Sequence, residues 1–262
     1  MEDVKKQYQD ASNLNIRIRM HQQYSTNKRD WHEWLFEQYQ IEMGSRILEL
    51  GCGDGTFWKK NRDCVPDSWM ITLSDFSSGM LADTQQTMGE APNISYRKID
   101  IQNIPYEDNQ FDVVIVNHML YHVPDRQRAI QEVRRVLKPQ GVFYASTIGE
   151  KHMMELNILL KGFDPALGDV LTNVQAAAFG LENGAEQLAP YFRYVQLKAF
   201  PGGLRIDDMH AIADYILSSG TEIKKIMTGA KLEDFIQYLE EEKEKQGGWI
   251  HITKATGLFE AR

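Results

Sequence analysis

The stretch Arg46-Ile47-Leu48-Glu49-Leu50-Gly51-Cys52-Gly53-Asp54-Gly55 decides the fold of this 262-residue chain. A short apolar run with an acidic residue near its end breaks into glycines at alternate positions, the pattern of a buried strand that enters a tight turn. Such a turn needs glycine because its backbone visits positive φ and because a Cβ would hold a ligand away. The spacing is G-x-G-x-G, whereas the dinucleotide fingerprint is G-x-G-x-x-G. The sequence therefore favours an adenosyl ligand that carries a charged amino acid and lacks a pyrophosphate.

Composition narrows the range of functions. The formal net charge is −8 at pH 7, which argues against broad nucleic-acid binding, since that needs a basic face to neutralise phosphates. No apolar stretch approaches the roughly 20 residues of a membrane-spanning helix. Residues 1–10 are polar and mixed in charge, unlike a signal or transit peptide, so we expect a cytoplasmic protein. Cys52 and Cys64 are too few for a disulfide framework and lack metal partners at finger spacing, so we expect reduced thiols.

Residues 45–149 alternate between strand and helix patterns. We expect strands at 47–50, 70–74, 94–99, 111–117 and 142–146, helices at 56–61, 78–88 and 126–137, and a Pro-Gly turn at 138–141. The run FDVVIVN at 111–117 is typical of a central parallel strand buried on both faces. The alternation predicts a doubly wound α/β fold, with a mostly parallel sheet and helices on both faces.

The flanking segments have different patterns. Residues 1–44 predict a helical preface, in which Trp31, Trp34, Leu35 and Tyr39 form a stripe along one helix face. Residues 150–190 are rich in Met, Leu and Ala and predict a helical cap inserted before the last strands. Residues 191–262 are expected to complete the same sheet, with strands at 192–199 and 249–259 and helices at 206–218 and 232–245.

Polar residues stand where the predicted strands end. Glu49 and the glycine turn close the first strand, Asp75 the second, Asp100 follows the third, and Asn117-His118 closes the fourth. Ligands of open α/β sheets bind beyond the carboxyl ends of the strands. One carboxylate alone is equally consistent with capping the next helix. Polar residues at consecutive strand ends favour a ligand site.

The segments ELGCGDG (49–55), LSDFSSGML (73–81), FDVVIVNHMLYHVPD (111–125) and LKPQGVFYAST (137–147), with Asp100 after the third strand, resemble the class I S-adenosylmethionine (SAM)-dependent methyltransferases. Within that family they are similar to the small-molecule branch with a D-x-S-x-x-M-L element. The resemblance covers about 45–148, and ITKATGLF (252–259) is similar to the family's closing strand. It implies a seven-stranded sheet with an antiparallel last strand, SAM as cofactor, and methyl transfer to an N, O or C atom of a small-molecule acceptor.

The resemblance also implies roles for individual residues. The implied cofactor-binding residues are Tyr24, Glu49, Gly51, Cys52, Gly53, Asp75, Phe76, Met80, Asp100, Ile101, Asn117 and His118. Glu49, the glycine turn and Asn117 with the His118 backbone would surround the methionine part, and Tyr24 would belong to a lid. Asp75 would bind both ribose hydroxyls, because a carboxylate accepts two hydrogen bonds at once.

The remaining residues would contact the adenine ring. Phe76 and Met80 would flank the ring through apolar contact. Asp100 would accept from the adenine amino group, while the Ile101 backbone N–H would donate to a ring nitrogen. These assignments follow from the resemblance and are expectations for the structure.

Methyl transfer from a sulfonium needs mainly positioning, desolvation and removal of the acceptor's proton. The candidate bases are His118 and His122, which follow the fourth strand. Histidines four residues apart on a helix could hold a metal, but this segment has a loop pattern and no third ligand, so no metal is predicted. His122 is equally consistent with orienting the loop through a backbone hydrogen bond.

Three alternatives stay open. A nicotinamide enzyme would also want an acidic residue about 20 positions beyond the glycines, although its glycine spacing differs. Some proteins of this fold bind SAM, or bind nothing, and act as structural or regulatory partners. The apolar residues of 150–190 are consistent with an acceptor pocket, a core or a homodimer face, because Met-rich surfaces adapt to many shapes.

Overall fold

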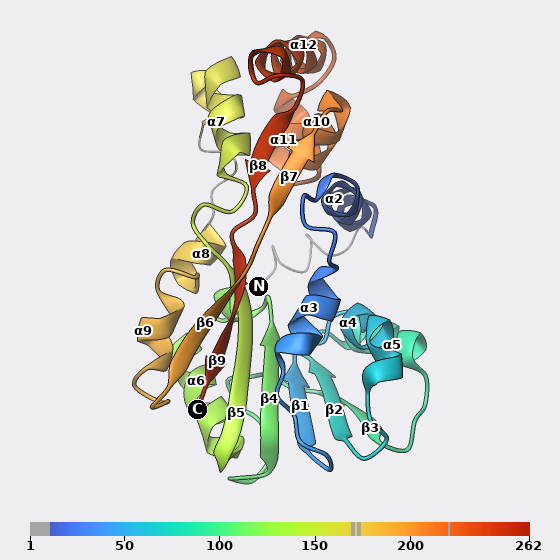
Figure 1. Cartoon of the computed structure of the whole chain (residues 1–262), viewed down its shortest axis with the longest axis vertical. Coiled ribbons are helices and arrows are strands. Elements are labelled where there is room, and N and C mark those ends of the chain that lie inside the picture. The colour runs from blue at the N-terminus through green and yellow to red at the C-terminus, as the bar shows by residue number, and fades with distance from the viewer. Residues whose placement is uncertain (1–10, 169–170, 172–173, 220) are drawn as a thin grey trace. The chain divides into compact units, whose positions relative to one another are not determined.

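Figure 1 shows the chain as a computed structural model that describes residues 11–168, 171, 174–219 and 221–262. The chain forms two compact units. The sheet unit comprises Arg29–Gly149, Gln175–Phe200 and Thr256–Arg262, and the helical unit comprises the described residues of Met1–Lys28, Glu150–Val174 and Pro201–Ala255. Among the described residues, no helix has both the length and the apolar character needed to cross a membrane.

The sheet unit is built on a seven-stranded sheet with the order β3-β2-β1-β4-β5-β9-β6. Its strands are β1 (Arg46–Leu50), β2 (Met70–Asp75), β3 (Ile94–Lys98), β4 (Phe111–Asn117), β5 (Leu137–Ile148), β6 (Val195–Phe200) and β9 (Thr256–Ala261). The pairs among β1 to β5 are parallel, whereas β9 runs antiparallel to β5 and β6. The predicted doubly wound sheet with an antiparallel last strand is confirmed.

Helices pack on both faces of this sheet, as predicted. They are α3 (Trp31–Gln38), α4 (Thr56–Lys60), α5 (Ser78–Met88), α6 (Arg126–Val136), α8 (Val174–Ala178) and α9 (Gly184–Leu188), with short 3-10 turns η1 (Arg62–Cys64) and η2 (Leu120–His122). Successive strand residues point to opposite faces. Leu48 and Leu50 accordingly join a core with α6 and α9, while Ile47 joins a separate core with α3 and α4.

The predicted turn at 138–141 is wrong. Helix α6 ends at Val136, and Leu137 already pairs with Phe111 in the sheet. The next pair on this ladder is Val113 with Val142. Residues 138–141 therefore form a bulge-like irregularity within β5, where the register shifts. A proline is tolerated at such an irregularity because its missing N–H interrupts no regular ladder bond.

The C-terminal strand predictions also need correction. The predicted strand at 249–259 is two strands, β8 (Ile250–Thr253) and β9, which belong to different sheets. Strand β8 pairs with β7 (Gly203–Ile206), a strand that the sequence pattern did not predict. The apolar pattern runs on without a break, but the chain passes from the helical unit to the sheet unit after Ala255. Residues 191–262 therefore complete the sheet only in part.

The helical unit has its own core. It contains α2 (Ala11–Tyr24), α7 (Met154–Phe163), η3 (Pro165–Leu167), α10 (Met209–Ser218), α11 (Thr221–Ile226), α12 (Ala230–Lys245) and the β7–β8 pair. Leu160 of α7, Ile212 of α10 and Phe235 of α12 are fully buried together with Leu204 and Ile252 of the two strands. A continuous apolar cluster thus joins segments that are distant in the sequence.

The compact units differ from the segment boundaries that the sequence predicted. The predicted preface, 1–44, is divided, because α2 belongs to the helical unit and α3 to the sheet unit. The predicted cap, 150–190, is divided at Val174, and its first part shares a core with 201–255. Residues 1–10, 169–170 and 172–173 of these segments lie outside the described residues.

A buried carboxylate joins α6 to the loop after β3. Glu132 is 3% exposed and accepts two hydrogen bonds from the Arg135 guanidinium, each 2.8 Å long, and one from the Ile104 backbone N–H at 3.0 Å. Arg135 also donates to the carbonyl oxygens of Ile104 and Tyr106. The hydrogen bonds from Arg135 lower the pKa of Glu132.

We expect Glu132→Ala to lower the free energy of unfolding by about 2–3 kcal/mol, because it leaves the Ile104 N–H without its acceptor and removes a charged partner of Arg135. The matched control is Asp108→Ala, since Asp108 pairs with the same Arg135 but is 67% exposed at its side chain. The control should cost about 0–1 kcal/mol. Denaturant unfolding measures both, and equal losses would contradict the structural role of Glu132.

Candidate functional site

The turn after β1 has the backbone that its glycines predict. Gly51, Gly53 and Gly55 have φ of 80°, 59° and 79°, a region that favours glycine. The backbone N–H groups of Gly51 and Cys52 both donate to the Ser74 carbonyl of the neighbouring strand, at 2.8 and 2.9 Å. The turn is therefore held against β2 by backbone bonds.

The glycines of this turn serve different purposes. A Cβ on Gly51 would lie 2.9 Å from Met119 Cγ, and one on Gly55 would lie 3.1 Å from Thr84 Cγ2. These two glycines allow close packing within the protein. A Cβ on Gly53, in contrast, would meet no protein atom within 4 Å. The side of the turn at Gly53 is therefore the place where a ligand can approach the backbone.

Glu49 of β1 is buried beside the glycine turn, with 1% of its surface exposed. Trp58 Nε1 of α4 donates to one carboxylate oxygen at 2.5 Å, and Asn117 Nδ2 of β4 donates to the other at 3.2 Å. Burial raises the pKa of Glu49 to about 7, although both hydrogen bonds favour the ionised form. Glu49 is thus a carboxylate that changes its charge near neutral pH.

Asn117 is oriented from its other side. Its carbonyl oxygen Oδ1 accepts from the Tyr39 hydroxyl at 3.1 Å and from Ser146 Oγ at 3.0 Å, which leaves its amide nitrogen to donate to Glu49. Tyr39 is buried, and desolvation raises its pKa well above the ordinary value. A neutral Tyr39 therefore remains a donor, and the network connects β1, β4 and β5.

Asp75 closes β2 and faces the glycine turn. One carboxylate oxygen accepts from the Gly53 N–H at 3.1 Å, and the other accepts from the Ser77 N–H at 2.7 Å. Asp75 is half-buried, and desolvation raises its pKa. An ionised carboxylate offers about four acceptor positions, so Asp75 can accept from a ligand in addition to its backbone donors.

The residues after Asp75 begin α5. Ser77 caps this helix by accepting from the Met80 N–H at 3.4 Å. Phe76 is 40% exposed and Met80 is half-buried, so apolar surface is available next to Asp75. An exposed aromatic ring beside a carboxylate suits a ligand with a sugar and a flat ring.

Asp100 follows β3, at the same edge of the sheet as Asp75. Both oxygens of Asp100 accept from the side-chain amide of Gln102, and Oδ1 also accepts from the Gln102 backbone N–H at 2.9 Å. Ile101 is buried with 3% exposure. The Ile101 side chain thus anchors the loop in the core while Asp100 remains half-buried.

The two candidate bases lie in the segment between β4 and α6. His118 has a φ of 50°, which is strained for a residue with a side chain and is frequent at functional positions. Its backbone N–H donates to Ser146 O at 3.1 Å, and its ring lies 5.2 Å from Trp31, centroid to centroid. His122 is half-buried, and desolvation lowers its pKa. Burial therefore favours the neutral form of the His122 imidazole.

The sheet brings most of the predicted residues to one edge. Hydrogen bonds connect Glu49 with Asn117 and Gly53 with Asp75 directly. Cys52 is buried in the same turn, its thiol 3.4 Å from Thr84 Oγ1, and desolvation raises its pKa. Tyr24 is different, because it lies in the helical unit, where it packs in that unit's core. Its role as a lid residue stays a prediction.

Sequence reasoning missed the residues that orient the site. They are Tyr39, Trp58, Gln102 and Ser146, which hold Glu49, Asp100 and Asn117 in place. Two of them carried a signal. Trp58 is a large aromatic directly after the glycine turn, and Ser146 ends a predicted strand. Tyr39 and Gln102 stand out only once their partners are known.

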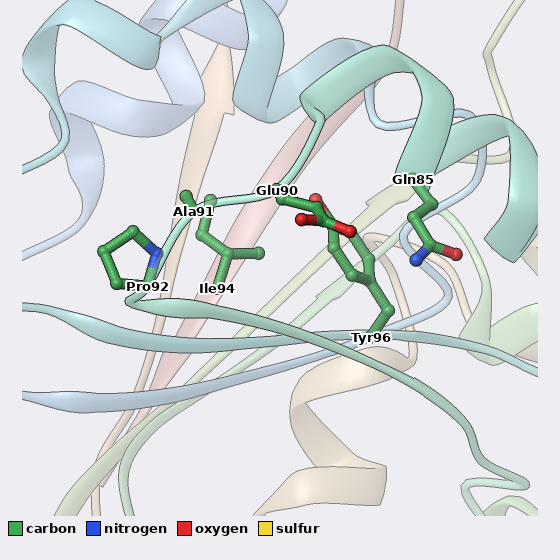
Figure 2. Close-up of a pocket in the computed structure, with 6 residues that line it drawn as sticks. All are labelled: Gln85, Glu90, Ala91, Pro92, Ile94 and Tyr96. Atoms are coloured by element: carbon green, nitrogen blue, oxygen red, sulfur yellow. The ribbon is translucent and has the colours of Figure 1, made fainter.

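Figure 2 shows a hollow elsewhere on the sheet unit, lined by Gln85, Glu90, Ala91, Pro92, Ile94 and Tyr96. It lies where α5 ends and β3 begins, as its lining residues show. The amino ends of parallel strands lie opposite the edge that carries Asp75 and Asp100. This hollow is therefore separate from the candidate site.

The chain is similar to known methyltransferases over the segment that contains most of these residues. Residues 48–145 match a family described as a methyltransferase domain. The ubiquinone/menaquinone biosynthesis C-methyltransferase UbiE of Haemophilus ducreyi is 31% identical over 116 residues, which cover 43% of this chain and 45% of that protein. The chain thus spans about half the length of the curated relatives it matches.

Solved structures show the same fold. YcgJ of Bacillus subtilis has a TM-score of 0.54 at 16% identity, with 87% of this chain and 96% of that chain covered. Phosphoethanolamine N-methyltransferase 2 of Haemonchus contortus, solved in complex with S-adenosyl-L-methionine, has a TM-score of 0.55 at 15% identity, with 88% and 51% covered. Together with the strand order, these similarities show that this chain has the same sheet fold as those proteins.

We expect a glutamate carboxyl carbon that titrates with a pKa of about 7 in NMR spectra of the ¹³C-labelled protein, and we expect Glu49→Gln to remove that signal. Trp58→Phe should move this pKa upward, because it removes a hydrogen bond that favours the ionised carboxylate. Trp69→Phe is the control, since its indole donates to the Glu42 carbonyl instead. A Glu49 signal with an ordinary pKa would contradict the buried network.

The raised pKa of Glu49 makes the free energy of unfolding depend on pH. A carboxyl whose pKa is raised on folding binds more protons in the folded chain between its unfolded pKa and about 7. The unfolding free energy should therefore fall as pH rises through that window, by roughly 3 kcal/mol for a shift of this size. Glu49→Gln should flatten the curve there. Denaturant unfolding at a series of pH values measures the slope.

Proposed function

We propose that this chain is a SAM-dependent methyltransferase that transfers a methyl group to an N, O or C atom of a small molecule. The observation that carries the proposal is the pairing of the Gly53 turn with the Asp75 carboxylate. A ligand can approach the Gly53 backbone, because a Cβ there would meet no protein atom within 4 Å. Asp75, bonded to the same turn, offers carboxylate oxygens as acceptors for the hydroxyls of a ribose.

The other residues fit the remaining parts of SAM. Glu49 and Asn117 stand beside the turn and suit the charged methionine end, Phe76 and Met80 offer apolar surface to the adenine, and Asp100 offers an acceptor to its amino group. Backbone contacts from Gly51, Cys52, Ile101 and His118 complete the proposed set. We also propose the D-x-S-x-x-M-L branch, in which Ser77, two residues after the proposed ribose-binding Asp75, caps α5.

SAM supplies an activated methyl group, so the protein's share of the chemistry is positioning, exclusion of water and removal of a proton. His118 and His122 are the proposed bases for an acceptor that loses its proton early. Nitrogen and carbon acceptors lose their proton late and depend less on a base. The name of the Haemophilus ducreyi relative supports a carbon atom as one acceptor class.

We propose cytoplasmic action on a small molecule, without nucleic acid or membrane as partner. We also propose a homodimer as the assembly.

We expect Asp75→Ala to weaken binding of S-adenosylhomocysteine by about ten- to a hundredfold, because the ribose hydroxyls lose a charged acceptor. Asp83→Ala is the control, an exposed carboxylate on neighbouring α5. Isothermal titration calorimetry with S-adenosylhomocysteine, and with NAD in parallel, measures both variants. Binding of NAD alone would favour a nicotinamide enzyme, and unchanged affinity in Asp75→Ala would refute the ribose assignment.

A methyl-transfer assay distinguishes an enzyme from a protein that only binds SAM. With [methyl-³H]SAM and a mixture of small-molecule metabolites, we expect label to move into a small organic product. His118→Asn should slow transfer to a hydroxyl acceptor at least tenfold with SAM affinity unchanged, and asparagine is chosen because it tolerates the positive φ at this position. Unaltered turnover would remove His118 as a base, and SAM binding without any transfer would favour a protein that only binds SAM.

A further inference from the structure

The side chain of Gln102 joins Asp100 to the start of α6. Its amide nitrogen donates to both oxygens of Asp100, at 3.0 and 3.3 Å. Its amide oxygen accepts from the Asp125 backbone N–H at 3.1 Å, and Asp125 is the residue that caps α6. One side chain therefore connects the loop after β3 with the loop after β4.

The orientation of this amide follows from its partners. A carboxylate only accepts and a backbone N–H only donates, so the nitrogen must face Asp100 and the oxygen must face Asp125. A rotated amide would lose the bonds on both sides. The hydrogen-bond partners thus select a single orientation for the Gln102 side chain.

The backbone of Gln102 is held as well. Its N–H donates to Asp100 Oδ1 at 2.9 Å, and its carbonyl oxygen accepts from Arg128 Nε of α6 at 3.3 Å. Two residues further on, Ile104 is buried and bonded to Glu132 of α6. Helix α6 therefore holds this loop at Gln102 and at Ile104.

We propose that Gln102 is a positioning residue that orients the Asp100 carboxylate for the adenine amino group. The inference rests on the proposed function, in which Asp100 reads adenine. A carboxylate that rotates freely loses conformational entropy when it binds a ligand. The hydrogen bonds from Gln102 already hold the Asp100 carboxylate in one orientation, so less entropy is lost on binding. Asp100 keeps an open acceptor position, since the three bonds from Gln102 leave one of its roughly four lone-pair sites unused.

The chemistry predicts a selective effect. Adenine presents an amino donor where hypoxanthine presents a carbonyl oxygen, and only the donor gains from an oriented carboxylate. Loss of Gln102 should therefore weaken binding of S-adenosylhomocysteine and leave binding of S-inosylhomocysteine nearly unchanged. A merely structural role would weaken both ligands to the same extent.

The test is a double-mutant cycle of Gln102→Ala and Asp100→Ala, read by calorimetric titration of the full chain with both nucleosides. We expect Gln102→Ala to weaken S-adenosylhomocysteine binding about tenfold and S-inosylhomocysteine binding less than twofold. In the Asp100→Ala background, Gln102→Ala should have no further effect. Asn103→Ala, on the exposed neighbouring residue, is the matched control and should bind as the wild type does.

Several outcomes would overturn the proposal. They are an unchanged affinity in Gln102→Ala, an equal loss for both nucleosides, or a further loss in the Asp100→Ala background. A wild-type chain that binds neither nucleoside would refute the proposed function together with this inference. Normal wild-type binding with no effect of Gln102→Ala would refute the role of Gln102 alone. Melting temperatures of all variants identify any loss that comes from unfolding.

Discussion

The parallel pairing of β1 with β2 on one side and β4 on the other is the constraint on which the rest of the site depends. Leu50 pairs with Ser74, and Glu49 pairs with Leu73 and Ile115, so the carboxyl ends of all three strands meet at one edge. The strand order reverses at β1 and β4, where ligands of such sheets bind. A one-residue slip of β1 would turn Glu49 to the opposite face and separate it from Trp58.

The polar side chains of the candidate site are held by hydrogen bonds within the protein, independently of a ligand. Glu49, Asn117 and Asp75 each hold two or more hydrogen-bond partners, drawn from different elements of the sheet unit. Burying a carboxylate is unfavourable, and the raised pKa of Glu49 expresses that cost. What the protein gains is preorganisation, because a ligand that meets fixed acceptors does not have to order them.

Much of the sheet unit was predictable from the sequence. Its central strands are apolar runs, and residue types typical of turns separate them from the helices. Strand β4 and helix α5 have the predicted bounds of 111–117 and 78–88. The helical unit was not predictable in the same way. Its β7 strand is short, and the β8 strand is continuous in pattern with β9, so only pairing partners distant in the sequence separate them.

The sequence by itself determined the doubly wound sheet, the glycine turn and the acidic residues at the strand ends. These features depend on local conformation and on period-two burial, which a single chain segment carries. Only the tertiary structure decided how those acidic residues are held. Tyr39 lies 78 residues from Asn117, and Gln102 lies 23 residues from Asp125, so neither bond has a local signature. The division into two units is likewise tertiary, since its cores join segments that the sequence keeps apart.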